Sequence, residues 1–173
     1  MKEIKGRAWK LGDNVDTDLI IAGPYLTIRD EDELASHALE AVLPEFAANA
    51  REGDFLFAGK NLGAGSSREE APYVLKKLGV RVIVAKSYAR IFFRNAVNLG
   101  LVALEHPTLP SEVEAGDSCS LDLKSFVLKD ETRGTTHELK PLPGFLMGIV
   151  EAGGALEKLR RELDRERRGA HES

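Results

Sequence analysis

Short apolar runs alternate with helical patterns between residues 54 and 105, and this alternation constrains the fold more than any other feature of the sequence. The run Val-Arg-Val-Ile-Val-Ala is rich in the β-branched residues that favour strands. The predicted elements follow one another as 54–59 (strand), 69–78 (helix), 80–85 (strand), 88–99 (helix) and 101–104 (strand). This order implies right-handed parallel crossovers, and ligands in such sheets bind beyond the carboxyl ends of the strands.

The flanking segments complete an α/β chain. Residues 4–10 predict a first strand, and 30–41 predict a helix with acidic residues in its first turn. After residue 118, short alternating segments separated by turn residues are typical of an antiparallel meander. Those segments are 119–123, 125–129 and 135–139, and predicted helices follow at 145–152 and 157–168. We expect one domain over residues 1–168 and a disordered tail over 169–173.

The loop after the first of the parallel strands has the chemistry of an anion-binding corner. Gly63 and Gly65 allow left-handed backbone angles or the close approach of a ligand. Ser66 and Ser67 fit the capping pattern of the helix that follows, and capping alone accounts for both serines. Arg68 adds a bidentate cation beside the N-terminal end of that helix, where backbone N–H groups favour a carboxylate or a phosphate.

A second polar cluster, Asp16-Thr17-Asp18, precedes the apolar run 19–22, which we predict as a strand leading into a loop at 24–29. Aspartates in such a place often hydrogen bond nearby backbone N–H groups in Asx turns. The functional alternative is that they orient a ligand at the end of a strand. The residues alone leave both interpretations open.

Composition excludes several classes of function. The net charge is −4, from 24 basic and 28 acidic residues, so no excess of positive charge indicates nucleic acid or an anionic membrane. Cys119 is the only cysteine, and the four histidines lack ligand spacing, so we expect this chain to bind no metal. No apolar run approaches membrane-spanning length, and the N-terminus lacks a signal-peptide layout, which predicts a cytoplasmic protein.

Three motifs occur in order along the chain and together resemble a known family. They are GDNVDTD at 12–18, GKNLGAGSSRE at 59–69 and AKSYARIFFRN at 85–95. The combination is similar to the small subunit of the two-subunit isopropylmalate dehydratases and homoaconitases, which corresponds to the swivelling C-terminal domain of aconitase. The resemblance covers nearly the whole chain.

The resemblance implies a swivelling β/β/α domain, in which a central, partly parallel sheet is flanked by helices and carries the antiparallel meander. It also implies a large-subunit partner with a [4Fe–4S] cluster, in a heterodimer or heterotetramer, so that no cofactor is bound by this chain. The implied reaction is dehydration and rehydration of a hydroxy acid. The open iron site acts as a Lewis acid, and a base removes a proton from the neighbouring carbon.

The same resemblance assigns site residues by position. The family's base is the first serine of its Gly-Ser-Ser-Arg motif, which matches Ser66. Ser67 and Arg68 match positions that bind the substrate carboxylate. A serine is a weak base unless its alkoxide is stabilised, and the helix N-terminus and the adjacent arginine are expected to do this. The residues expected to support the site rather than perform chemistry are Asp16, Thr17, Asp18, Gly63 and Gly65.

The loop after Gly23-Pro24 is expected to select the substrate. Homoaconitase-type chains tend to carry an arginine two residues after the tyrosine, whereas this chain has Thr27 and then Ile28, which favour an apolar isopropyl group. The resemblance therefore implies isomerisation of 2-isopropylmalate to 3-isopropylmalate, in leucine biosynthesis. The alternative substrates are homocitrate and homoisocitrate, in lysine biosynthesis. This alternative stays open because Arg29 can pair with an extra carboxylate.

Two interpretations from other classes stay open. The chain can be a free-standing anion-binding or regulatory module, which binds a carboxylate tightly and has no affinity for a cluster-bearing partner. It can also be a structural partner that only closes an active site. In that case substitutions of Ser66 and Arg68 would leave activity intact.

Overall fold

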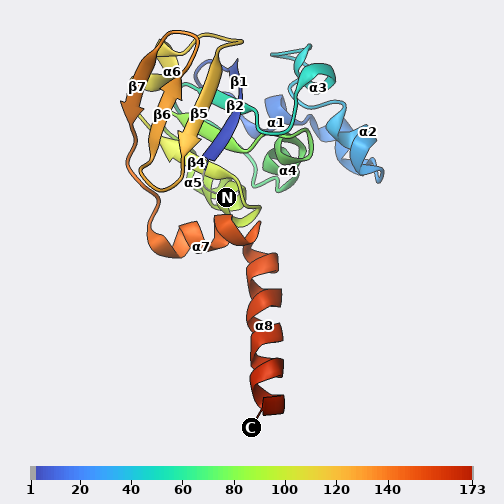
Figure 1. Cartoon of the computed structure of the whole chain (residues 1–173). Helices are drawn as coiled ribbons and strands as arrows, with labels where there is room; N and C mark the ends of the chain where they lie inside the picture. The colour runs from blue at the N-terminus through green and yellow to red at the C-terminus, as the bar shows by residue number, and fades with distance from the viewer. Residues whose placement is uncertain (1–2, 173) are drawn as a thin grey trace.

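The computed structural model describes residues 3–172, which form one seven-stranded mixed sheet in the order β4-β3-β2-β1-β5-β6-β7, flanked by helices (Figure 1). The strands are β1 (Glu3–Lys10), β2 (Phe55–Ala58), β3 (Val82–Ala85), β4 (Val102–Glu105), β5 (Ser118–Asp122), β6 (Val127–Asp130) and β7 (Thr135–Glu138). The helices are α1 (Thr17–Ile20), the 3-10 helix η1 (Gly23–Thr27), α2 (Glu31–Ala35), α3 (Phe46–Asn49), α4 (Glu70–Lys77), α5 (Arg90–Asn98), α6 (Leu109–Glu112), α7 (Gly144–Ala152) and α8 (Ala155–Glu172).

Strand β1 joins a parallel half of the sheet to an antiparallel half. It runs parallel to β2, with Ala8 opposite Phe55, and antiparallel to β5, with Ile4 opposite Leu121. The parallel order β1-β2-β3-β4 and the antiparallel meander β5-β6-β7 confirm the fold class and both halves of the predicted topology. The short helix α6 was missed, because four residues that include a proline carry no helical periodicity.

The middle strands of the parallel half form the centre of the core. Every side chain of β2 and β3 is buried, as expected for parallel strands that are covered on both faces. Helices α4 and α5 lie on one face, since both crossovers are right-handed and run in the same direction along the sheet. The carboxyl ends of β2 and β3 therefore open onto the loops that precede these two helices (Figure 1).

Two segments near the N-terminus differ from the prediction. The apolar run 19–22, predicted as a strand, lies partly in the one-turn helix α1, because the carboxylate of Asp16 accepts a hydrogen bond from the backbone N–H of Leu19 at 2.8 Å and caps that helix. The segment 24–29, predicted as a loop, begins inside the 3-10 helix η1, with Pro24 in its first turn.

Helix boundaries account for most other differences. The helix predicted over 30–41 ends at Ala35, and a series of turns follows in which Leu39 has a positive φ of 57°. Helix α5 begins at Arg90, and Ser87 does not cap it; the hydroxyl of Ser87 instead accepts a hydrogen bond from the N–H of Asn61 at 2.8 Å. Such long-range partners are invisible to local sequence patterns.

The C-terminal helix α8 leaves the body of the molecule and points away from the sheet (Figure 1). It is longer than predicted: residues 169–172 are helical, whereas the sequence predicts a disordered tail from residue 169. Position 173 lies outside the described residues. Over the described part of the chain, a helix with the length and apolarity needed to cross a membrane is absent.

Candidate functional site

The loop between β2 and α4 is shaped by glycines that no other residue can replace without strain. Gly63 and Gly65 have φ angles of 84° and 98°, in the left-handed region. A Cβ on Gly63 would lie 2.1 Å from Cγ of Phe92, a side chain that is 2% exposed. The loop thus packs directly on helix α5 and has one available path, which fixes the position of the serines that follow.

The polar segment at the start of α1 lies alongside this loop, although the two are far apart in the sequence. The N–H of Gly63 donates to the carbonyl oxygen of Val15 at 2.8 Å, and the N–H of Thr17 donates to the carbonyl oxygen of Ala64 at 2.9 Å. These backbone hydrogen bonds align the two segments residue by residue. They bring Asp16, Thr17 and Asp18 next to the Gly-Ser-Ser-Arg sequence, as the sequence predicts.

The side chain of Thr17 lies against that of Ser66. The Thr17 side chain is buried, with the residue 2% exposed, whereas Ser66 is exposed. The hydroxyl of Thr17 donates to the carbonyl oxygen of Ser66 at 3.0 Å and lies 3.3 Å from the Ser66 hydroxyl oxygen. The hydroxyl of Ser66 thus faces solvent on one side and a fixed hydroxyl on the other.

Neither serine of the loop caps helix α4. The helix begins at Glu70, its N-cap is Glu69, and within residues 3–172 it has no side-chain capping hydrogen bond. The capping explanation of Ser66 and Ser67 is therefore wrong. Both residues are exposed, so their hydroxyl groups remain available to a ligand.

The Arg68 guanidinium is held in place by Asp18 and a backbone carbonyl group. Its Nη1 group donates to Oδ1 of Asp18 at 2.8 Å and to the carbonyl oxygen of Ile21 at 3.0 Å. Asp18 Oδ1 also accepts from the N–H of Gly23 at 3.2 Å. The Arg68 guanidinium, followed by the Gly23 N–H, holds the pKa of Asp18 below its usual range. The arginine points toward Asp18 and makes no hydrogen bond to the Ser66 side chain, unlike the sequence-based expectation.

The three residues expected to select the substrate lie at the end of η1 and beyond it. Thr27 and Arg29 are exposed, and Ile28 is half-buried against the core. Among the described residues, none of the three hydrogen bonds to Ser66, Ser67 or Arg68. The hydrogen bond between η1 and the site is made by Gly23 at the start of η1, whose N–H donates to Asp18.

A cluster that the sequence did not reveal contacts η1 through Tyr25. The ring of Tyr25 stacks on the ring of His37 with centroids 3.8 Å apart and an interplanar angle of 8°. Glu40 Oε2 lies 3.2 Å from Nδ1 of His37. These residues, together with Asp18, line a cavity of about 220 Å³. A spacing of 12 residues between an aromatic side chain and a histidine is not a recognisable sequence signal.

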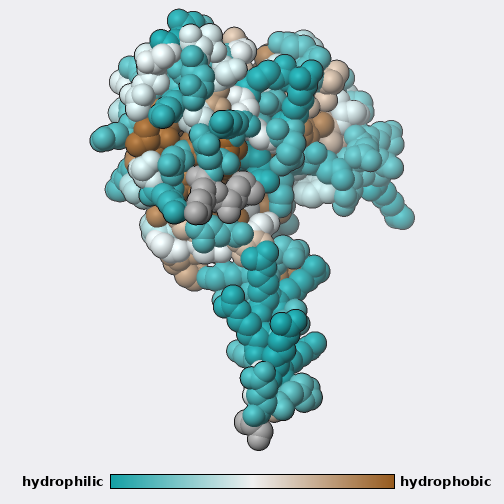
Figure 2. Space-filling view, in the orientation of Figure 1, coloured by the Kyte–Doolittle hydropathy of each residue, from teal (hydrophilic) through white to brown (hydrophobic). Residues whose placement is uncertain are grey.

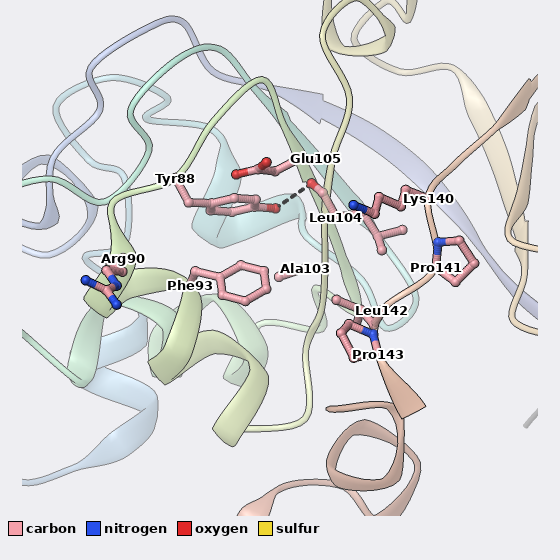
Figure 3. A pocket seen from close by; sticks show the side chains of 10 residues that line it. All are labelled: Tyr88, Arg90, Phe93, Ala103, Leu104, Glu105, Lys140, Pro141, Leu142 and Pro143. Carbon is pink, nitrogen blue, oxygen red and sulfur yellow. Dashed lines mark hydrogen bonds between the residues drawn. The ribbon is translucent and has the colours of Figure 1, made fainter. Parts of the chain in front are cut away.

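A larger cavity lies away from the loop at 24–29. It has a volume of about 660 Å³, at the carboxyl end of β4, and its lining is mostly apolar. Figure 3 shows Tyr88 and Phe93 on one wall and the segment from Lys140 to Pro143 on the other. The Tyr88 hydroxyl lies 2.9 Å from the carbonyl oxygen of Leu104, and burial raises the pKa of this phenol well above its usual value. None of the predicted site residues lines this cavity.

The described residues do not assemble a metal centre. No group of three or more histidine, cysteine, aspartate and glutamate side chains between residues 3 and 172 is arranged to hold a metal ion. Cys119 is 2% exposed in strand β5, and burial raises its pKa to about 12. This thiol is a core residue of the sheet.

Comparison with known proteins identifies relatives over nearly the whole chain. Residues 13–109 match the family model described as the aconitase C-terminal domain. A 3-isopropylmalate dehydratase small subunit 1 of Archaeoglobus fulgidus is 50% identical over 88% of this chain and 94% of its own length. The methanogen homoaconitase small subunit of Methanothermobacter thermautotrophicus is 47% identical over 93% of both chains.

A solved structure is similar over the same extent. The crystal structure of a 3-isopropylmalate dehydratase from Methanocaldococcus jannaschii superposes with a TM-score of 0.88 at 41% sequence identity. The match covers 96% of this chain and 99% of that chain. The mixed sheet, the crossover helices and the meander are therefore the common architecture of these proteins.

Proposed function

Because this chain belongs to the aconitase C-terminal domain family, and within it to the 3-isopropylmalate dehydratase type of small subunit, we propose that it is the small subunit of a hydro-lyase that isomerises 2-isopropylmalate to 3-isopropylmalate. The observation that carries the proposal is the exposed Ser66 hydroxyl, held 3.3 Å from the buried hydroxyl of Thr17 on a loop that ends in Arg68. The chain acts together with a large subunit that completes the site.

Ser66 serves as the base in this proposal. Its hydroxyl is not used for helix capping, and one side of it is open to solvent. When the exposed Ser66 hydroxyl has given its proton to solvent, the Thr17 hydroxyl can rotate from the Ser66 carbonyl oxygen to the alkoxide, because both acceptors lie within 3.3 Å. A hydrogen bond to the charged form lowers the pKa of a group. Thr17 therefore replaces Arg68 as the alkoxide-stabilising side chain expected from the sequence.

Arg68 and Ser67 bind a carboxylate of the substrate in this proposal. Both acceptors of Arg68, Asp18 and Ile21, are engaged by the same nitrogen, Nη1. Within residues 3–172 the Nε and Nη2 groups of Arg68 have no acceptor, which leaves this edge of the guanidinium available for bidentate pairing. Asp18 thus orients the arginine, and the exposed Ser67 hydroxyl adds a donor next to it.

An iron–sulfur cluster does not fit this chain. The sole cysteine, Cys119, is buried in the sheet, and the structure places no other soft ligand beside it. Cluster ligation requires several exposed thiolates. We therefore assign the [4Fe–4S] cluster to the large subunit, and the residues of this chain to proton transfer and carboxylate binding.

Replacing Thr17 by valine tests its support of Ser66. Valine keeps the shape and removes the donor, so kcat of the assembled enzyme is expected to fall about 10- to 100-fold, the value of a hydrogen bond to a charged group. The pH dependence of kcat is expected to shift to higher pH, because the alkoxide of Ser66 loses its donor. Thr17→Ser should restore both quantities. A Thr17→Val enzyme with unchanged kcat and pH profile would assign Thr17 a purely structural role.

The substrate is tested by offering 2-isopropylmalate and homocitrate in parallel to the chain mixed anaerobically with its large subunit. The half-buried Ile28 and the absence of an arginine at position 27 favour the isopropyl group, so turnover of 2-isopropylmalate is expected. Exposed Arg29 and the similarity to a homoaconitase small subunit support the second candidate. Turnover of homocitrate alone would assign Arg29 to the extra carboxylate. Turnover of neither acid would favour a non-catalytic anion-binding module.

A further inference from the structure

Helix α8 projects from the body of the molecule, and its side chains are exposed along most of its length (Figure 1). Its 18 residues extend for roughly 27 Å, at about 1.5 Å per residue, and none of them is buried. It projects from the body below α7 (Figure 1), and the side seen in Figure 2 is largely hydrophilic. In proteins, most of the stability of a helix comes from packing of its apolar face, so an exposed apolar face on α8 is a candidate contact surface.

One side of α8 carries a stripe of leucines. Leu156, Leu159 and Leu163 are 61%, 50% and 44% exposed. Their spacing of three and four residues is that of successive a, d and a positions of a heptad repeat. Large apolar side chains exposed in a row mark an interaction surface.

The leucine stripe faces away from the rest of the molecule. Helix α7 is contacted by the opposite side of α8, where Nζ of Lys158 lies 4.5 Å from the ring centroid of Phe145. At about 100° per residue, the centre of the leucine stripe lies roughly 130° around the helix from Lys158. A second helix can therefore pack on the stripe without displacing α7.

The two flanks of the leucine stripe carry opposite charges. Glu162 lies on one side of it, and Arg160 and Arg167 lie on the other. Glu166 occupies the d position that follows Leu163, so the apolar seam ends at Leu163. Within the chain, Arg160 is paired with Glu157 at 3.3 Å, and Glu162 lies 4.0 Å from Lys158. All of these side chains are at least partly exposed, so exchanging these partners costs little.

We propose that α8 pairs in parallel with α8 of a second copy of this chain, through the leucine stripe. In a parallel two-fold pair, the acidic flank of each helix faces the basic flank of the other, which places Glu162 opposite Arg167 of the second copy, twice. In an antiparallel pair, acidic flanks face each other and basic flanks face each other. The flanking charges Glu162 and Arg167 are thus complementary in the parallel orientation and not in the antiparallel one. This inference does not depend on the proposed chemistry.

Sedimentation equilibrium of the full-length chain without its large subunit tests the pairing. The wild type is expected to reach twice the chain mass of 18.9 kDa as its concentration rises. Leu159→Asp is expected to raise the dimer dissociation constant at least about tenfold, because it buries a charge in the seam. Ile91→Asp, at a 51% exposed aliphatic residue of α5, is the matched control and should leave the dimer unchanged. A wild type that stays monomeric would overturn the proposal.

Charge exchange tests the parallel orientation. E162R and R167E each place like charges opposite one another in a homodimer, so each variant alone is expected to dimerise more weakly. An equimolar mixture of the two restores opposite charges at both contacts and is expected to form a mixed dimer, detectable when one variant carries a mass tag. The proposal would be overturned if no mixed dimers formed. It would also be overturned if the wild type were monomeric and Leu159→Asp lost binding to the large subunit. The second result would assign the stripe to the large subunit.

Discussion

Ser66→Ala is expected to reduce kcat of the assembled two-subunit enzyme by about 100- to 10,000-fold, because a positioned general base contributes that much to proton transfer. Ser66 is exposed and caps no helix, so its removal leaves folding and subunit assembly intact. The measurement is the steady-state rate with 2-isopropylmalate, together with circular dichroism and the mass of the complex.

The neighbouring serine provides the control for this substitution. Ser67 is equally exposed, and like Ser66 it does not cap α4. In the proposed site, Ser67→Ala removes a carboxylate contact rather than the base, so its main effect is expected in KM. Equal losses of kcat in the two variants would contradict the assignment of Ser66 as the base, and near-normal turnover by Ser66→Ala would assign the chain a structural role.

Arg68→Gln is expected to lower kcat/KM by about 100- to 1,000-fold, mostly through KM, since the arginine proposed to bind the substrate carboxylate is replaced by a neutral side chain. Arg68→Lys keeps the charge but not the planar fork, and an intermediate loss is expected. Asp18 is exposed, so the loss of its ion pair with Arg68 has little effect on stability.

Arg90→Gln is the matched control for Arg68. Arg90 is an exposed arginine at the start of α5, on the rim of the large cavity, and its replacement changes the net charge by the same amount. Similar kinetic effects of the two substitutions would indicate a general electrostatic contribution of positive charge. An effect confined to Arg68 would indicate direct pairing with the substrate.

The sequence predicts the strands of this fold well, because their signals are local. The β-branched run that forms β3 and the alternating segments of the meander identify their elements without reference to the rest of the chain. The first residue of a helix is harder to predict from the sequence. Asp16 creates α1 by capping an apolar run that has strand-like composition, and the serines that fit a capping box before α4 have no capping role.

The sequence predicted which two segments lie side by side, but not the contacts between them. The motifs correctly bring Asp16, Thr17 and Asp18 beside the loop that carries Ser66 and Arg68. Which side chain supports which is decided by backbone hydrogen bonds between segments almost 50 positions apart, and no local pattern encodes them. Arg68 therefore turns toward Asp18, and the hydroxyl next to Ser66 is that of Thr17.

The most direct test of the central claim is the dehydratase rate of a fixed amount of large subunit as this chain is added under anaerobic conditions. Each subunit alone is expected to be inactive, and the rate is expected to rise in proportion to this chain until the two are equimolar. The Ser66→Ala chain should compete for the same large subunit and lower the rate. A large subunit that turns over fully by itself, or a rate that does not respond to this chain, would contradict the claim that the two subunits share one active site.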